Sequence, residues 1–315
     1  MRRALIVGID DYQARPLSGC VNDAIRIGDT LSRNEDGSAN FACRLLTAPS
    51  ANVTRSILKN NIEELFAHDA DVALFYFSGH GVLTKLGGYL VTQDATKYDE
   101  GVAMSDVIIL ANQALIREVL IILDCCHSGA FGDIPIFDND RAILREGISI
   151  LASSRSSQSS LEVGGSGVFT SLVCDALNGG ASDVCGNVTA ASVYAYVDLA
   201  LGAWDQRPLL KSHVSKLISL RQCRPEIEMG ILRLLPKYFP DPYYEFPLDP
   251  SYEPDVEPRD KAHEEILRHL QIYRVARLLV PIGEEHMYYA AMRSKSCKLT
   301  PLGRYYLKVV TSGRL

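Results

Sequence analysis

Short apolar runs alternate with longer amphipathic segments through roughly the first 220 residues of the chain. Three of these runs, ALIVGI, VALFYFS and VLIILD, are almost continuously hydrophobic, which is typical of parallel strands covered on both faces. The pattern predicts strands at residues 4–9, 43–47, 72–78, 118–124 and 148–152, and helices at residues 20–33, 52–67, 104–115, 168–178 and 189–201. Right-handed crossovers between such elements predict an α/β fold, a three-layer sandwich with a mostly parallel sheet.

The character of the chain changes between Pro236 and Pro258, where seven of its 14 prolines lie among Asp, Glu and Tyr residues. Proline cannot pair in a central strand or continue a helix, so we expect an extended, solvated linker here. The aromatic side chains of the segment leave a second interpretation open, in which it is a strap held against the first domain.

A helical pattern returns at Ala262, and a late helix is expected after Pro301. We interpret this part of the chain as a small helical module of winged-helix type. The predicted domains are therefore residues 1–224, a Pro-rich linker or strap at residues 225–258, and a small helical, winged-helix-like domain at residues 259–315.

The composition is that of a folded protein, because 47% of the residues are hydrophobic and only 22% are charged. The apolar stretches are far shorter than the roughly 18 residues that a membrane span needs, so we expect no membrane insertion. Eight cysteines occur without a CxxC pair. This pattern argues against a disulfide framework and structural zinc, and favours a reducing, cytoplasmic location.

The negative charge is unevenly distributed. The net charge of −6 lies wholly in residues 1–224, which argues against a nucleic-acid-binding surface on that part. The final 23 residues carry six basic side chains and no acidic one. We interpret them as a solvated basic face, and nucleic-acid binding is the alternative.

Reactive side chains follow two of the predicted strands. The run VALFYFS ends at Gly79-His80-Gly81, and VLIILD ends at Cys125-Cys126. Ligands bind beyond the carboxyl ends of parallel strands, and neighbouring strands lie about 4.8 Å apart. If the two strands are adjacent, His80 lies beside a cysteine. An imidazole can accept the thiol proton or stabilise the thiolate, which is the form that attacks a carbonyl.

Backbone N–H groups near these residues can stabilise the oxyanion that such an attack produces. We expect the N–H groups of Gly81 and of the nucleophile to supply this hydrogen bonding.

Six motifs in order, ALIVGIDDY, LSGCVNDA, FYFSGHG, ILDCCHSG, ILASS and GVFTSLVCDAL, resemble those of the caspase-like cysteine peptidases, and are most similar to the metacaspase and bacterial caspase-homologue branch. The resemblance implies a caspase-like fold, with His80 as the catalytic histidine and Cys126 as the nucleophile. Side-chain alternation agrees, because it places Asp124 and Cys126 on one side of the strand and Cys125 in a packing layer.

The resemblance also indicates substrate preference. Asp23 and Asp124 match the acidic pair that lines a pocket for Arg or Lys in metacaspases, and an acidic side chain would be repelled there. An ordinary acidic residue in the first turn of a helix is the alternative interpretation of Asp23. We therefore expect protein substrates that are cleaved after Arg or Lys.

Metacaspases commonly bind calcium through acidic residues that follow the catalytic histidine. Here Asp94, Asp99, Glu100 and Asp106 are dispersed and include no adjacent aspartate pair. We interpret the stretch as a solvated acidic loop and expect no metal and no cofactor, with calcium as the alternative.

Two polar loops offer basic residues for self-processing, namely Arg141, Arg145 and Arg155. The C-terminal domain is expected to gate the peptidase by sensing a nucleotide or nucleic-acid signal or a partner protein. Family likeness implies a role in bacterial antiviral defence or cell death. The alternatives are a catalytically silent scaffold that binds peptides or other partners, and a nucleic-acid-dependent regulator.

Overall fold

The computed structural model describes residues 1–67, 69–125, 144–153, 162–163, 166–202 and 208–315. Two compact units are present. The first comprises residues 1–182 and 186–224, and the second comprises residues 183–185 and 225–315.

A six-stranded sheet forms the centre of the first unit, in the order β12-β8-β7-β3-β1-β2. All neighbouring strands are parallel except β12, which pairs antiparallel with β8 at one edge. The strands are β1 (Arg2–Ile9), β2 (Ala42–Ala48), β3 (Val72–Ser78), β7 (Glu118–Asp124), β8 (Ile148–Ala152) and β12 (Leu209–His213). The predicted α/β sandwich with a mostly parallel sheet is confirmed. Every residue of β3 is buried, as its continuous apolar sequence predicts.

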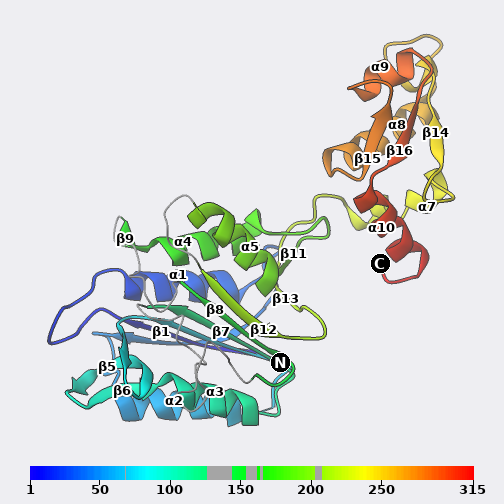
Figure 1. The fold of residues 1–315 in the computed structure, drawn as a ribbon. Helices are drawn as coiled ribbons and strands as arrows, with labels where there is room; N and C mark the ends of the chain where they lie inside the picture. Colours follow the sequence, from blue (N-terminus) through cyan, green and yellow to red (C-terminus); the bar gives the residue numbers. More distant parts are fainter. Residues whose placement is uncertain (68, 126–143, 154–161, 164–165, 203–207) are drawn as a thin grey trace. The chain divides into compact units, whose positions relative to one another are not determined.

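Helices cover both faces of this sheet, which makes three layers (Figure 1). On one face lie α2 (Arg55–Ala67) and α3 (Met104–Gln113); on the other lie α1 (Cys20–Ser32), α4 (Val168–Asp175) and α5 (Ala190–Leu201), with a π-helical turn at Ala176–Gly180 after α4. Each helical layer contributes a separate hydrophobic core with one face of the sheet. Gly8 allows α1 to approach β1 closely, because a Cβ atom there would overlap the carbonyl oxygen of Cys20.

A second, antiparallel sheet follows β3 and differs from the acidic loop that the sequence predicts. Its strands are β4 (Gly81–Thr84), β5 (Gly87–Thr96) and β6 (Asp99–Ala103). Two short pairs complete the first unit, β9 (Glu162–Val163) with β10 (Ser166–Gly167) and β11 (Asn187–Thr189) with β13 (Ser219–Gln222). The acidic residues of this region therefore lie on ordered strands and on α3.

The second unit has its own hydrophobic core and a three-stranded sheet in the order β14-β16-β15. Its elements are α6 (Met229–Leu232), α7 (Leu235–Tyr238), β14 (Glu245–Pro247), a 3-10 turn (Pro250–Tyr252), α8 (Lys261–Val275), β15 (Leu279–Ile282), α9 (Met287–Met292), β16 (Ser296–Leu299) and α10 (Pro301–Thr311). The late helix expected after Pro301 is confirmed as α10. The sheet adds strands to a module that was expected to be mainly helical.

The Pro-rich segment differs from the extended linker predicted for residues 225–258. Leu235, Tyr238, Phe239 and Leu248 are at most 4% exposed and belong to the core of the second unit. The segment also supplies β14, which pairs with β16. Proline excludes regular structure but does not prevent burial of the apolar side chains next to it. The Pro-rich composition therefore predicted a solvated segment, whereas several of its apolar side chains are buried. In the residues that the structure describes, no helix has the length and apolar character needed to cross a membrane.

Candidate active site

His80 lies just beyond the end of β3, beside the end of β7. The two strands are parallel neighbours, and Ser78 pairs with Asp124. The pairing extends one residue further, because the N–H of Gly79 donates to the carbonyl of Asp124 at 3.4 Å. The predicted adjacency of the two strands is therefore confirmed.

Tyr12, which follows β1, holds the backbone and ring of His80. The backbone N–H of His80 donates to the Tyr12 hydroxyl at 3.0 Å, and that hydroxyl donates to the carbonyl of Val91 at 3.2 Å. The two rings also pack together, with centroids 4.6 Å apart. Tyr12 is 6% exposed, and this burial raises its pKa, so the hydroxyl keeps its proton.

Gly79 makes room for this contact. A Cβ atom at position 79 would lie 2.5 Å from the Tyr12 hydroxyl and 3.0 Å from the ring of Phe77. A glycine is therefore required sterically before the histidine.

The carbonyl of Arg15 determines the tautomer of His80. It lies 2.7 Å from Nε2, and because a carbonyl only accepts, Nε2 must carry the proton and donate it. In the neutral ring Nδ1 is then unprotonated and can act as a base. Arg15 itself has a φ of 61°, a left-handed conformation that is uncommon for a residue with a side chain.

The loop that carries Tyr12 and Arg15 is tied down by Asp10. The Asp10 carbonyl accepts hydrogen bonds from Tyr12 at 3.1 Å and Leu17 at 2.9 Å. Its carboxylate accepts from the backbone N–H groups of Cys20 at 2.8 Å and Val21 at 3.3 Å, at the start of α1. This anchoring holds the Arg15 carbonyl beside the imidazole.

A cavity of about 350 Å³ opens beside the imidazole. Gly81, one of the residues singled out from the sequence, lines it together with His80. The remaining lining residues are Tyr12, Gln13, Ala14, Arg15, Val82, Val91, Thr92, Gln93 and Ala95.

Asp23 on α1 and Asp124 at the end of β7 meet around Gly167, which precedes α4. A Cβ atom on Gly167 would lie 2.5 Å from Oδ2 of Asp124 and 3.1 Å from Oδ2 of Asp23, so both carboxylates approach the same point. Asp23 is only 2% exposed and Asp124 only 6%. The structure thus brings together the acidic pair that the sequence singled out.

Hydrogen-bond donors orient both carboxylates. The N–H of Gly167 donates to Oδ2 of Asp23 at 2.8 Å, and the Thr170 hydroxyl donates to Oδ2 of Asp124 at 2.7 Å. Tyr76 is hydrogen-bonded to Thr170 at 2.6 Å. Burial, together with the charges of Asp124 and Asp23, raises the Tyr76 pKa. Both carboxylates therefore act on the same buried tyrosine.

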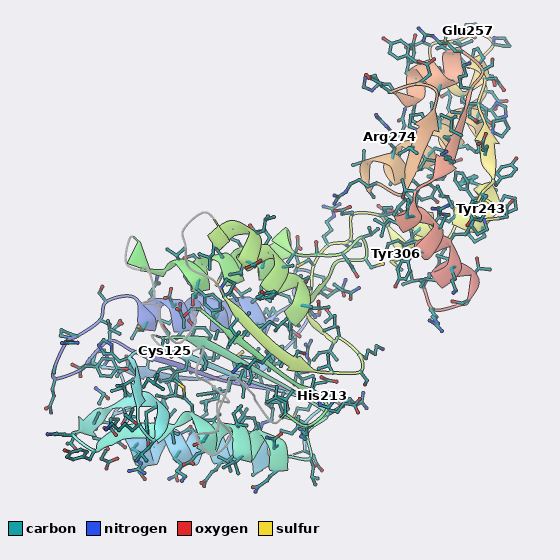
Figure 2. All side chains as sticks on the ribbon, in the orientation of Figure 1. Cys125, His213, Tyr243, Glu257, Arg274 and Tyr306 are labelled. Atoms are coloured by element: carbon teal, nitrogen blue, oxygen red, sulfur yellow. The ribbon has the colours of Figure 1, made fainter. Side chains whose placement is uncertain are left out.

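Cys125 directly follows β7 and is 1% exposed within the core formed with α2 and α3 (labelled in Figure 2). The expectation that it points into a packing layer is confirmed. The expected nucleophile, Cys126, lies outside the described residues, as do Arg141 and Arg155. Arg145 is described, and its side chain donates to the carbonyls of Ala111, Ile116 and Glu146.

Most of the acidic residues that follow His80 are bound to α2. Asp94 accepts from the backbone N–H of Arg55 at 2.9 Å, and Asp99 forms an ion pair with the Arg55 side chain. Asp106 lies 3.4 Å from Nζ of Lys59. Among the described residues, no group of three or more His, Cys, Asp or Glu side chains is arranged to hold a metal ion. Asp94, Asp99 and Asp106 therefore each contact a residue of α2.

Sequence reasoning missed the contacts made by Tyr12, Arg15, Gly79, Gly167 and Thr170. Four of the five lie inside the motifs that carry the family resemblance, and this position could have marked them as functional candidates. Their contacts could not be predicted from the motifs, because each residue contacts an element distant in the sequence.

The match with known proteins agrees with this geometry. The protein-family model of the caspase domain matches residues 1–218. Metacaspase-3 of Trypanosoma cruzi (strain CL Brener) is 30% identical over 165 residues, which are 45% of this chain and 45% of that protein. Metacaspase-5 of Trypanosoma brucei brucei is 31% identical over 153 residues, 42% of this chain and 30% of that protein. The chain spans less than half the length of these curated relatives.

Solved structures show the same fold. A protein of Geobacter sulfurreducens, GSU0716, matches with a TM-score of 0.53 and 17% identity, over 71% of this chain and 98% of that one. Caspase-1 of Spodoptera frugiperda matches with a TM-score of 0.50 and 14% identity, over 71% and 91%. The caspase-like fold inferred from the motifs is thus confirmed, and the chain belongs to the caspase-domain family of peptidases.

Proposed function

We propose that this protein is a cysteine endopeptidase that cleaves protein substrates after Arg or Lys, with Cys126 as the nucleophile and His80 as its base. The observation that carries the proposal is the state of His80. Its Nε2 is occupied by the Arg15 carbonyl, which leaves Nδ1 to accept a proton at the rim shared by β3 and β7. Ser78 and Asp124 are paired in the sheet, and His80 and Cys126 each come two residues later in the sequence.

In the proposed reaction, His80 Nδ1 takes the thiol proton of Cys126, and the sulfur attacks the substrate carbonyl. The N–H groups of Gly81 and Cys126 donate to the oxyanion. The C–N bond then breaks, and the leaving amine takes the proton from His80. Water, deprotonated by His80, hydrolyses the thioester and releases the thiol. All the groups used belong to the chain, the substrate and water, so the proposal requires no cofactor.

The acidic pair supports the proposed preference for a basic residue before the scissile bond. Asp23 and Asp124 hold buried carboxylates around one point, where a substrate cation would be attracted and an acidic side chain repelled. Both acids are oriented by donors on α4 and the residue before it.

We further propose that the second unit gates the peptidase in response to a signal or a partner, since it has a core of its own. A cytoplasmic location is proposed because Cys43, Cys174, Cys223 and Cys297 carry free thiols, as expected in a reducing compartment. Likeness to the caspase-domain family supports a proposed role in bacterial defence or cell death.

The test is hydrolysis of fluorogenic peptides with Arg, Lys or Asp before the scissile bond, with added calcium and with a chelator. We expect cleavage after Arg and Lys, loss of activity in Cys126→Ala and His80→Ala, and full activity in the Cys43→Ala control. Cleavage that survives in Cys126→Ala would refute the assigned nucleophile. An absence of cleavage in the wild type would favour the silent scaffold.

A second set of variants tests the pocket. Asp23→Asn and Asp124→Asn are each expected to lower kcat/KM for the Arg peptide by roughly tenfold or more, because each removes a charged acceptor. The exposed Asp69→Asn is the matched control. If all three variants cleave the Arg peptide equally well, the acidic pair does not set the preference.

A further inference from the structure

A separate cavity lies in the second unit, between α10 and the loop that precedes β14. Its volume is about 770 Å³, which is within the usual range of ligand sites. The lining residues are Pro240, Pro242, Tyr243, Pro301, Arg304, Tyr305, Leu307, Lys308, Thr311 and Ser312. None of them belongs to the site around His80, and the proposed peptidase reaction does not use them.

The sequence of α10 explains why one side of the helix is left to the cavity. Gly303 and Tyr306 are buried in the second unit. Tyr305 and Lys308 lie on the exposed side, and Tyr305 is 59% exposed. One side of the cavity is therefore formed by the ring of Tyr305 and the cation of Lys308, and the other side includes the prolines of the loop before β14.

Two cations line this cavity, and among the described residues neither forms an ion pair with an acidic side chain. Arg304 and Lys308 line it, and no lining residue is acidic. The ion pairs described for the second unit join other residues, namely Arg259 with Glu264, His263 with Asp260, Arg268 with Glu265 and Arg293 with Glu284. The charge of the cavity is thus complementary to an anionic occupant.

Arg304 stacks on a tyrosine ring and still has free donors. Its guanidinium lies over the ring of Tyr243, 5.0 Å from the centroid. Tyr243, labelled in Figure 2, is itself positioned by a turn in which its N–H donates to the Asp241 carboxylate at 2.8 Å. Stacking uses the flat face of the guanidinium and leaves its in-plane N–H groups able to bind a carboxylate.

The spacing of the two cations indicates the shape of the occupant. Positions 304 and 308 are one helical turn apart, about 6 Å along the axis. Alternate side chains of an extended peptide project from the same face about 6.7 Å apart. Two acidic side chains at alternate positions would therefore reach both cations, while apolar neighbours contact Tyr305 and the prolines.

The overall charge favours a peptide over a nucleic acid. Residues 225–315 contain 13 basic and 13 acidic side chains, and only two of the basic ones line the cavity, fewer than the row of cations with which proteins bind a phosphate backbone. Tyr, Arg and Pro are in contrast well suited to a protein interface, where aromatic residues and Arg are enriched.

We propose that the cavity along α10 binds an extended segment of a partner protein that carries two acidic side chains at alternate positions among apolar residues. This recognition is independent of the peptidase site and would bring the partner to the second unit.

The test measures fluorescence anisotropy of labelled octapeptides with the full-length protein. The panel has two Asp residues at alternate positions, with Leu, Pro, Phe, Tyr, Gly or Ala elsewhere and no Arg or Lys. We expect saturable binding by members with apolar neighbours, and binding weaker by roughly tenfold or more when both Asp are replaced by Asn. If no member saturates, the proposal is overturned.

Variants locate the binding. Arg304→Gln and Lys308→Gln are each expected to weaken peptide binding by roughly tenfold. The control is Lys298→Gln, which removes an exposed cation of the same unit outside the cavity and should leave affinity unchanged. Binding unaffected by the first two variants would place the peptide elsewhere and refute the site.

Two further measurements examine other occupants. A labelled deoxythymidine octamer that binds more tightly than every peptide, and depends on Arg304 and Lys308, would overturn the peptide assignment in favour of nucleic acid. Sedimentation equilibrium in which the wild type dimerises and Lys308→Gln does not would overturn it in favour of a second copy of the chain.

Discussion

At the scale of single residues, the proposed chemistry depends on how His80 is held. Its backbone is fixed by the Tyr12 hydroxyl and its Nε2 by the Arg15 carbonyl. The same hydroxyl reaches the carbonyl of Val91 on β5, so one oxygen links three parts of the chain. Tyr12 does not touch the reacting atoms in the proposed mechanism and is a positioning residue.

Replacing Tyr12 by Phe keeps the ring and removes the hydroxyl. The N–H of His80 and the carbonyl of Val91 then lose their partner, which typically costs about 1–3 kcal/mol for a buried group. We expect kcat to fall roughly tenfold with little change in KM, because the imidazole is displaced while the acidic pocket is intact. Steady-state kinetics of Tyr12→Phe measure this.

The control for this variant is Tyr98→Phe, since Tyr98 is 83% exposed and its hydroxyl has no such role. A Tyr12→Phe enzyme with the kcat of the wild type would show that the ring alone positions His80. A melting temperature lowered without any loss of kcat would assign Tyr12 a purely structural role.

At the scale of elements, α8 shows how the second unit accommodates a buried polar group. His269 is 5% exposed, yet both ring nitrogens are bonded. Nε2 lies 3.0 Å from the Arg268 guanidinium, which can only donate, so Nε2 accepts and Nδ1 carries the proton toward the Tyr238 hydroxyl at 2.8 Å. Protonation would place a second cation beside Arg268.

Burial and, to a smaller extent, the charge of Arg268 lower the His269 pKa below its ordinary 6.5. Below pH 6.5 His269 binds a proton more readily in the unfolded chain than in the folded unit. Its contribution to stability is therefore fully present above pH 6.5 and is lost as the pH falls from 6.5 toward the lower pKa of the folded state. We expect faster hydrogen exchange in α8 at pH 5.5 than intrinsic exchange rates explain, and a smaller pH effect in His269→Gln.

Mass spectrometry of the peptides covering α8 provides this measurement. His286→Gln, which alters an exposed histidine of the same unit, should retain the pH dependence of the wild type. An equal pH dependence in His269→Gln and the wild type would contradict the assignment of the effect to His269.

At the scale of the whole molecule, the accessibility of basic residues limits where the proposed self-processing can occur. Arg145 donates three side-chain hydrogen bonds to carbonyls of the chain, and its own N–H donates to Asn112 at 2.7 Å. A residue held in this way cannot enter a pocket for a basic side chain without breaking these bonds. Arg141 and Arg155 remain as the proposed cleavage sites.

Intact-mass analysis of the wild type beside Cys126→Ala tests self-processing. We expect fragments that end at Arg141 or Arg155 in the wild type and an uncut chain in the variant. Fragments that end at Arg145 would show that its anchoring does not protect it. Identical masses in both proteins, under conditions in which peptide substrates are cleaved, would remove self-processing from the proposed function.

The sequence alone determined most of the central architecture. The predicted strand 72–78 coincides with β3 and 118–124 with β7, because apolar runs of this length can be buried on both faces only in the middle of a parallel sheet. The same runs locate His80 at a strand end. Family motifs then singled out Asp23 and Asp124, whose carboxylates the structure brings to one point.

Only the tertiary structure decided which groups touch. Tyr12 reaches His80 across 68 positions, and Gly167 reaches Asp23 across 144, and no local pattern encodes such contacts. The Pro-rich segment shows the same limit, because its prolines excluded regular structure but could not reveal that Tyr238 and Phe239 would be buried. Burial depends on the surfaces that a segment meets, and those surfaces exist only once the chain has folded.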